Sequence, residues 1–304
     1  MIQISVPATS ANMGPGFDCM GIALNIYNTF TIQEIQEGLN ISGCPLELCN
    51  EKNLIYQSML QCFQVIGYPP KGYNIHIESK IPLSRGLGSS ATCIIGGVLA
   101  ANEIAGNPLS KEELLCIANK IEGHPDNIAP ALFGGIVLSL YEEDKVYYNK
   151  LCLPKELKFC ALIPDFSLST QQAREVLPKK ISYEDAIFNI SHASLLISAL
   201  LNGNYDLLKH ACQDRLHQPY RGELIPHYHE IIEKCKDLDI LCTFLSGAGP
   251  TIMTILKQEN QNFVPSIKKY LNTLSHHWNV IELQMDLKGA QVKSIESLKK
   301  HPIK

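Results

Sequence analysis

A glycine-containing stretch at residues 82–91 restricts the folds open to this chain more than any other segment. Before it, residues 73–78 alternate apolar and polar side chains, which predicts a half-buried strand. After it, residues 91–105 are rich in Ala, Gly and Ile, which predicts a buried helix. A strand, a glycine loop and a helix start aim backbone N–H groups and the positive end of a helix dipole at one point. Such a point favours an anion, and phosphate is the usual one.

The glycine spacing alone does not identify the ligand of this loop. No lysine stands where a Walker loop requires one, so the common P-loop is excluded. The pattern Gly86-x-Gly88-x-x-Ala91 fits the loose dinucleotide fingerprint, but a Rossmann unit needs a strand after the helix, and here a second helix is expected. A tight turn with an N-capping serine remains the alternative.

Composition excludes several classes of function. The 304 residues carry a formal net charge of −4, which argues against nucleic acid or an anionic membrane as the main partner. The cysteines number eleven and form no C-x-x-C pair, so we expect free thiols in a reducing cytoplasm. No apolar run reaches the length of a membrane span, and the first residues do not resemble a signal peptide.

A second loop without periodicity follows the first expected strand. Residues 2–6 alternate apolar and polar side chains, whereas residues 7–18 do not. Two glycines and a proline shape this loop and leave Ser10, Asn12 and Asp18 as polar groups on a stiff turn, placed to contact a ligand. Asx turns, in which Asn12 and Asp18 bond their own backbone, are an equally weighted alternative.

Four polar side chains crowd residues 122–127, directly after an expected helix. A carboxylate such as Glu122 would repel an anion on the glycine loop unless a cation lay between them. Mg²⁺ resolves that repulsion, because it favours carboxylate, hydroxyl and phosphate oxygens. The alternatives are that Asp126 or Asn127 caps the next turn and that His124 is a hydrogen-bonded loop residue.

The other segments predict a change of architecture near residues 150–157, where we place a domain boundary. The expected order of the second half suggests an antiparallel sheet with helices on one face. Strands are expected at residues 21–36, 135–140, 157–164, 241–245, 252–256 and 280–285. Helices are expected at residues 53–65, from 110 to 122, from 169 to 177, and at 183–201, 206–216, 227–236 and 264–274.

The loops carry a family resemblance that covers nearly the whole chain. Four of them, taken in order, resemble those of the GHMP small-molecule kinases: residues 7–18, 82–91, 122–127 and 246–251. The first and third are most similar to the members of the family that act on L-homoserine. Residues 169–174 and 219–221 also match places where those members hold their amino acid.

The resemblance implies an α+β, two-domain GHMP kinase fold with domains at residues 1–153 and 154–304. The first would be similar to domain 2 of ribosomal protein S5 and bind ATP; the second would be ferredoxin-like and contribute to the substrate site. The implied reaction is the ATP-dependent phosphorylation of the L-homoserine hydroxyl, which gives O-phospho-L-homoserine and ADP in threonine biosynthesis. The implied partners are these small molecules, without nucleic acid or membrane, and a homodimer is compatible with the family.

The resemblance also assigns a nucleotide site and a metal site. Ser90 and Glu122 would hold Mg²⁺, although Ser84 and Ser89 are further candidates for the metal. Asn127 would lie beside them at the reacting hydroxyl, as a third catalytic residue. The triphosphate of ATP would be wrapped by Pro82, Leu83, Ser84, Arg85, Gly86, Leu87, Gly88, Ser89, Ser90 and Ala91.

The amino-acid site follows from the same resemblance. Arg174 and Arg221 would bind the substrate carboxylate and Asp18 its ammonium group, which suits a zwitterion. Many relatives are described as using an aspartate base near the acceptor hydroxyl, where this chain has Asn127 with Asp126 adjacent. We therefore expect transfer without a dedicated side-chain base, with the proton ending on phosphate. The hydroxyl end of the substrate is assigned to Asn12, His124, Asn127 and Thr170.

Two other functions fit the same loops. Another GHMP kinase would act on mevalonate or a sugar, and those acceptors lack the zwitterion that Arg174, Arg221 and Asp18 would bind. A non-catalytic nucleotide-binding regulator on the same fold would not need Ser90 and Glu122 to hold a metal for transfer.

Overall fold

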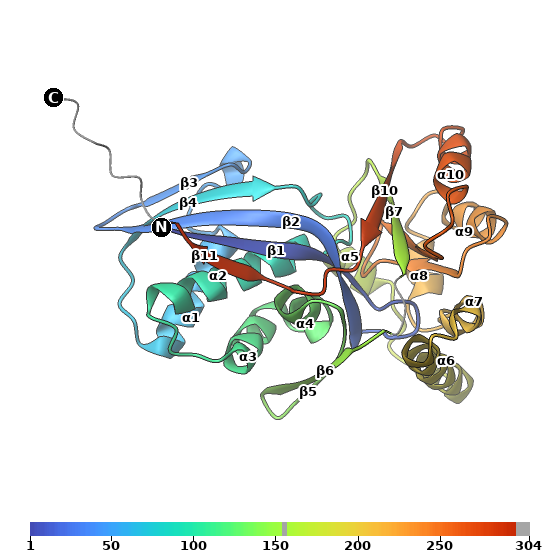
Figure 1. Ribbon diagram of the computed structural model, residues 1–304, viewed down its shortest axis with the longest axis horizontal. Helices are drawn as coiled ribbons and strands as arrows, with labels where there is room; N and C mark the ends of the chain where they lie inside the picture. The colour runs from blue at the N-terminus through green and yellow to red at the C-terminus, as the bar shows by residue number, and fades with distance from the viewer. Residues whose placement is uncertain (154–156, 296–304) are drawn as a thin grey trace.

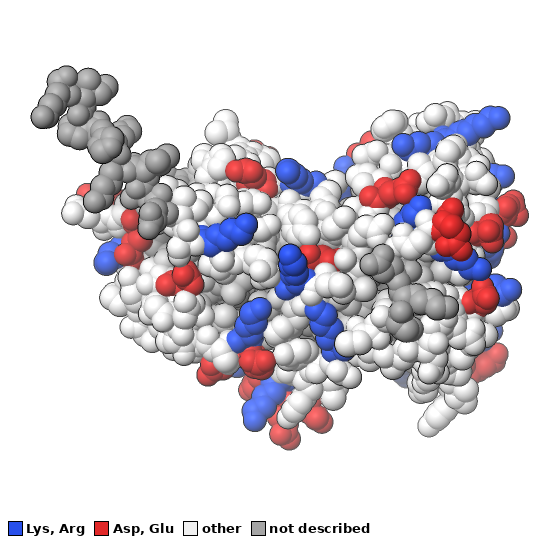
Figure 2. All heavy atoms as spheres, in the orientation of Figure 1, with Lys and Arg blue, Asp and Glu red and all other residues white. Residues whose placement is uncertain are grey.

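The computed structural model describes residues 1–153 and 157–295 as two sheets with helices packed on them (Figure 1). In these ranges, no helix combines the length and the apolar character that crossing a membrane requires. Acidic and basic side chains are interspersed over the face shown in Figure 2. The two sheets and their packed helices confirm the expected α+β class with two domains.

The first sheet contains seven strands among the described residues, in the order β11-β1-β2-β4-β3, with β5 also pairing with β2 and β6 pairing with β5. It is antiparallel except for the parallel pair β3 and β4. Helices α1 to α4 cover one face of this sheet (Figure 1). Its strands are β1 (Ile2–Ala11), β2 (Met20–Ile35), β3 (Leu39–Ser42), β4 (Gly72–Ser79), β5 (Ile136–Glu142), β6 (Lys145–Leu151) and β11 (Gln291–Ser294).

Capping residues fix where some of the helices on the first sheet begin. Asn53 caps the first of them by accepting a hydrogen bond from the N–H of Ile55. Ser110 and Glu113 form the expected capping box of the third. These helices are α1 (Leu54–Ile66), α2 (Ser89–Ile104), α3 (Lys111–Glu122) and α4 (Pro125–Phe133), with a short 3₁₀ helix η1 at Leu46–Leu48.

The second sheet has four antiparallel strands in the described part of the chain, in the order β10-β7-β9-β8. They are β7 (Lys158–Pro164), β8 (Cys242–Leu245), β9 (Ile252–Leu256) and β10 (Trp278–Gln284). The surrounding helices are α5 (Thr170–Glu175), α6 (Tyr183–Asn202), η2 (Tyr205–Leu207), α7 (Leu208–Ala211), α8 (Gln218–Gly222), α9 (Tyr228–Lys236) and α10 (Phe263–Leu271).

Both faces of the second sheet are covered, so the prediction of helices on one face is wrong. Phe159 on β7 belongs to a core shared with α6, α7 and the first sheet, whereas its neighbour Cys160 packs with α9 and α10. Every residue of β7 is buried. A strand buried on both faces lacks the alternation that would show a second covering layer in the sequence.

The chain returns to its first sheet at the end. Strand β11 follows β10 and pairs with β1 beside the chain start, as Figure 1 shows. The predicted domain boundary between residues 153 and 154 adjoins residues 154–156, which lie outside the described residues. It remains a proposal, supported by β6 and β7 lying in different sheets on either side of it.

Two local predictions differ from the structure. Strand β1 extends through residues 7–11, expected as loop, because a shift of register between Pro7 and Ala8 accommodates the proline. The helix expected at residues 206–216 is reduced to η2 and α7. Beyond α7 the Asp214 carboxylate accepts hydrogen bonds from backbone N–H groups that would otherwise continue the helix.

A buried asparagine, which the sequence did not single out, fixes the entry to the glycine loop. Asn28 on β2 accepts hydrogen bonds from the N–H groups of Lys80 and Ile81 at 3.0 and 3.1 Å. Its amide donates to the Thr92 hydroxyl on α2 at 2.9 Å. One side chain therefore ties the sheet, the loop and the helix together.

We expect Asn28→Leu to lower the free energy of unfolding by about 2–4 kcal/mol, because each buried polar group left without a partner costs about 1–3 kcal/mol. Urea denaturation measures this as a lower midpoint with an unchanged slope. Asn40→Ala, at an exposed pair with Asn74 on the same sheet, is the control. Equal midpoints for the two variants would contradict the role given to Asn28.

Candidate active site

A cavity of about 410 Å³ opens where the two sheets meet. Its walls come from the glycine loop, the segment between β1 and β2, the α3–α4 junction, α5, α8 and the β8–β9 turn. Segments that are far apart in the sequence thus converge on one space. We call the part of its lining formed by the glycine loop the glycine-loop end, and the part that contains Arg174 and Arg221 the arginine end.

At the glycine-loop end, backbone approaches so closely that side chains would not fit. Gly86 has φ +73° and a Cβ there would lie 2.4 Å from the carbonyl oxygen of Ser246. Gly88 has φ +67°, and its Cβ would lie 1.9 Å from Oγ1 of Thr9. Both positions require glycine. Directly after Gly88, α2 starts with Ser89, whose buried hydroxyl has no partner among the described residues.

The β8–β9 turn holds the glycine loop in place. The fully buried Ser246 hydroxyl lies 2.5 Å from the carbonyl oxygen of Gly86 and 2.7 Å from the Ser10 hydroxyl. The N–H of Thr251 donates to the carbonyl of Arg85 at 3.3 Å. The Arg85 guanidinium in turn donates to carbonyls at the end of β7 and just beyond it, at 3.0 and 2.7 Å. The second sheet therefore fixes the shape of a loop that belongs to the first.

A serine and a glutamate face each other beside the start of α2. The Ser90 hydroxyl donates to Oε2 of Glu122 at 3.0 Å. Burial raises the pKa of Glu122 above its ordinary value, although the charge of His124 and the bond from Ser90 partly oppose this. A hydroxyl oxygen and a carboxylate oxygen in contact are donors that suit a hard divalent cation.

The next turn brings together a histidine, an aspartate and an asparagine. His124 Nδ1 lies 2.7 Å from Oδ1 of the buried Asp126, which also accepts from the Asn127 amide at 3.4 Å. The side-chain oxygen of Asn127, Oδ1, accepts a hydrogen bond from the Thr9 hydroxyl at 2.7 Å. Burial alone would lower the pKa of His124, but the hydrogen bond and charge of Asp126 outweigh it and raise the pKa overall.

At the arginine end, Asp18 and Arg174 form a bidentate ion pair at 2.8 and 3.1 Å. Carboxylate oxygens of Asp18 and Asp126 and a ring nitrogen of His124 lie within 4.8 Å of one another, a spacing open to a metal ion. The charge of Arg174 on Asp18 disfavours a cation at that point. Arg221 is buried nearby, and burial, with the positive charge of Arg174, lowers the pKa of Arg221 to about 10.

Comparisons with known proteins show the family of the chain. The model of the GHMP kinase N-terminal domain matches residues 53–135, and that of the C-terminal domain matches residues 196–272. The chain is 54% identical to a homoserine kinase of Clostridium botulinum (strain Kyoto / Type A2), over 97% of this chain and 99% of that protein. The chain belongs to the homoserine kinases of the GHMP family.

Solved structures of the family have the same fold. A homoserine kinase from Cytophaga hutchinsonii superposes with a TM-score of 0.86 at 29% identity, covering 96% of this chain and 97% of that one. A putative homoserine kinase from Listeria monocytogenes gives 0.79 at 31% identity, covering 97% and 100%. A mevalonate kinase shares the fold at 18% identity and a TM-score of 0.64, covering 94% and 99%.

The cavity brings together nearly all of the residues that the sequence singled out. Three of the loop residues do not line it: Pro82 lies outside, Ala91 is buried in the core between the first sheet and its helices, and Ser10 is fully buried against Ser246. The lining residues among those predicted are Asn12, Asp18, Leu83, Ser84, Arg85, Gly86, Leu87, Gly88, Ser89, Ser90, Glu122, His124, Asn127, Thr170, Arg174 and Arg221.

Sequence reasoning missed several residues at the site. Thr9 and Phe17 stand in the first loop, and a hydroxyl or aromatic on a stiff loop was the available signal. His217 stands four residues before Arg221, one helical turn away, which could have suggested a contact. No local pattern marks the apolar wall formed by Cys44, Pro45, Leu48, Leu54 and Cys93.

We expect Ser246→Ala to lower the free energy of unfolding by about 1–3 kcal/mol, because it removes the donor that holds the glycine loop. It should also speed amide hydrogen exchange at residues 86–89, which mass spectrometry measures. Ser194→Ala, whose exposed hydroxyl returns to its own helix, is the control. Exchange at residues 86–89 that matches the wild type would contradict the bracing role.

Proposed function

We propose that this protein transfers the γ-phosphoryl group of ATP to the hydroxyl of L-homoserine, giving O-phospho-L-homoserine and ADP as a step of threonine biosynthesis. The observation that carries the proposal is a single cavity with an anion-binding loop at one end and paired opposite charges at the other. Phosphoryl transfer depends mostly on positioning and charge neutralisation, which such a cavity supplies.

The nucleotide is assigned to the glycine-loop end. The backbone of residues 84–90 and the positive end of the sixteen-residue helix α2 favour a polyphosphate. The unpartnered Ser89 hydroxyl supports this, because a buried donor without a partner is costly unless a ligand accepts from it. The apolar wall that includes Leu48 and Leu54 suits a flat base.

We assign Mg²⁺ to Ser90 and Glu122. Their oxygens suit this cation, and a half-buried carboxylate beside a phosphate loop needs a positive charge between the two. The bound ion would supply neutralisation of phosphate charge during transfer. Glu122 contributes its negative charge, and Ser90 holds the carboxylate in one orientation.

The amino acid is assigned to the arginine end. In this structure Asp18 and Arg174 neutralise each other, and both are partly exposed to the cavity. A zwitterion would separate them, with its ammonium group on Asp18 and its carboxylate on Arg174 and Arg221. Both charges would then remain paired when substrate binds. Mevalonate has no ammonium group, and a neutral sugar has neither charge, so they would leave Asp18 or the arginines without a partner.

The hydroxyl end of the substrate would lie near Asn12, His124, Asn127 and Thr170, which all line the cavity. Asp126 already accepts hydrogen bonds from His124 and Asn127, so it orients its neighbours rather than standing free as a base. We therefore infer that the hydroxyl proton ends on the transferred phosphate.

The eleven cysteines are free thiols, which supports a reducing setting, and we propose the cytoplasm. A homodimer stays a prediction, as does the absence of nucleic-acid and membrane partners.

A coupled ADP-release assay with homoserine, mevalonate and galactose tests the function. We expect turnover with homoserine and little with the other two acceptors. Faster turnover of mevalonate or galactose would favour another GHMP kinase. Nucleotide binding without ADP release on any acceptor would favour a non-catalytic regulator.

We expect Arg174→Met to raise KM for homoserine about tenfold to a hundredfold, because a hydrogen bond to a charged group contributes about 1.5–3 kcal/mol. The KM for ATP should stay within about twofold, since the Arg174 guanidinium bonds to Asp18 and makes no hydrogen bond to the described glycine loop. Steady-state kinetics with each substrate varied measures both constants. Arg215→Met is the matched control, because Arg215 also stacks on a phenylalanine, at 4.0 Å from the Phe188 ring centre, outside the cavity.

Loss of a general base lowers the rate about 10²–10⁴-fold. Because we infer that Asp126 is not the base, we expect Asp126→Asn to retain turnover within about a hundredfold of the wild type. Single-turnover kinetics at saturating substrates measures the chemical step. A much larger loss of kcat with unchanged KM values would identify Asp126 as the base and contradict transfer of the proton to phosphate.

A further inference from the structure

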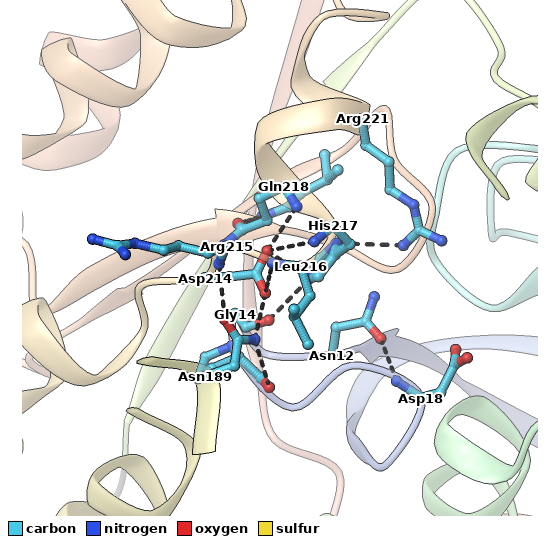
Figure 3. A network of polar contacts seen from close by, with 12 residues as sticks. Asn12, Gly14, Asp18, Asn189, Asp214, Arg215, Leu216, His217, Gln218 and Arg221 are labelled. Atoms are coloured by element: carbon cyan, nitrogen blue, oxygen red, sulfur yellow. Dashed lines mark hydrogen bonds and ion pairs between the residues drawn. The ribbon is translucent and has the colours of Figure 1, made fainter. Parts of the chain in front are cut away.

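A buried polar network lies behind the arginine end of the cavity (Figure 3). It joins α6, the segment after α7, α8 and the loop between β1 and β2. We propose that His217, held by Asp214, is a positioning residue that orients Arg221 toward the carboxylate of the substrate. This inference rests on the proposed function and extends it to residues that do not line the cavity.

The partners of His217 define its protonation. Its Nε2 lies 2.9 Å from the carbonyl oxygen of Gly14, which only accepts hydrogen bonds. Its Nδ1 lies 3.4 Å from Nη1 of Arg221, which only donates. The ring therefore carries its proton on Nε2 and accepts at Nδ1, as a neutral imidazole. Burial favours the same form by lowering the pKa of His217, although the charge of Asp214 opposes it.

Asp214 holds the segment that presents His217. Its carboxylate accepts from the N–H groups of Leu216, His217 and Gln218 at 3.1, 2.9 and 2.7 Å. It also accepts from the Asn189 amide on α6 at 2.7 Å. Four donors around one buried carboxylate leave the start of α8 a single arrangement.

Asn189 extends this arrangement to the first loop. Its amide also donates to the carbonyl of Pro15 at 3.4 Å, and its oxygen accepts from the N–H of Arg215 at 2.9 Å. His217 bonds to Gly14, the residue before Pro15. The loop that carries Asn12 and Asp18 is thus fixed to α6 and α8 at two consecutive carbonyls.

Arg221 is the group on which the network acts. It is only 2% exposed, and its Nε and Nη1 donate to the carbonyls of Ala173 and Gly247, each at 3.0 Å. Its Nη2 makes no hydrogen bond within the described ranges, and none of the carboxylates in them bonds to its guanidinium. A buried cation with only neutral partners is costly, and a substrate carboxylate would relieve that cost.

Phe17 completes the positioning. Its ring stacks on His217 with centroids 5.1 Å apart and an interplanar angle of 17°. The guanidinium carbons of Arg221 and Arg174 lie 5.0 and 5.8 Å from the same ring centre. His217 therefore sets the place of the aromatic surface against which both arginines lie.

The test compares three variants of the full-length protein. His217→Phe keeps the ring but removes both hydrogen bonds, and His217→Gln can keep a donor toward Gly14 without an acceptor at the place of Nδ1. His217→Asn can place its carbonyl oxygen near that position and so restore the acceptor. His192→Phe is the control, since His192 also stacks on a phenylalanine, at 3.7 Å from Phe188.

We expect His217→Phe and His217→Gln to raise KM for homoserine about tenfold, the scale of one hydrogen bond to a charged group. The KM for ATP and kcat should stay within about threefold, and His217→Asn should recover most of the affinity. A loss of stability alone would not raise the KM for homoserine while leaving the KM for ATP unchanged. If His217→Phe fails to fold, the comparison of His217→Gln with His217→Asn tests the positioning role.

The two proposals fail in different ways. A wild-type protein without activity on homoserine would overturn the proposed function. An active wild type with an unchanged KM for homoserine in the Gln and Phe variants would overturn the positioning role alone. Equal KM values for the Asn and Gln variants would overturn the role of the Nδ1 acceptor.

Discussion

The contact between the β8–β9 turn and the glycine loop is the constraint on which the cavity depends. Ser246, in the turn directly after β8, bonds to the carbonyl of Gly86 and to Ser10 on β1. The next residue, Gly247, accepts hydrogen bonds from both Asn12 and Arg221 through its carbonyl. One short turn therefore holds both the glycine loop and Arg221. We infer that this turn sets the distance between the nucleotide phosphates proposed at the glycine loop and the substrate carboxylate proposed at Arg221.

Charge is arranged in the cavity so that each substrate group would meet a partner already present. Asp18 and Arg174 neutralise each other, the half-buried Glu122 accepts a hydrogen bond from Ser90, and Arg221 is buried with neutral partners. The first pair opens to a zwitterion, whereas Glu122 and Arg221 each need an opposite charge. We propose that a metal-bound polyphosphate complements Glu122 and that an amino acid complements Asp18, Arg174 and Arg221.

The local chemistry of the chain was predictable wherever one segment decides its own structure. The Asn53 cap, the capping box at Ser110 and the strand at β4 need only their neighbours in sequence. Predictions failed where another part of the chain decides. The residues after α7 leave the helix because Asn189 and backbone groups surround Asp214, and β11 forms because β1 offers a free edge. Asn189 and β1 both lie far along the chain from these segments, so no local pattern marks either of them.

The sequence by itself determined the residue types of the site: the glycines, the paired arginines, the acid at Glu122 and the loops that carry them. It did so because anion binding, metal binding and zwitterion recognition each need particular functional groups. Only the tertiary structure decided that these groups share one cavity, that Asp18 pairs with Arg174, and that His217 bonds to the carbonyl of Gly14. Those contacts join segments from different sheets, and their geometry depends on how the two hydrophobic cores pack rather than on any single stretch of chain.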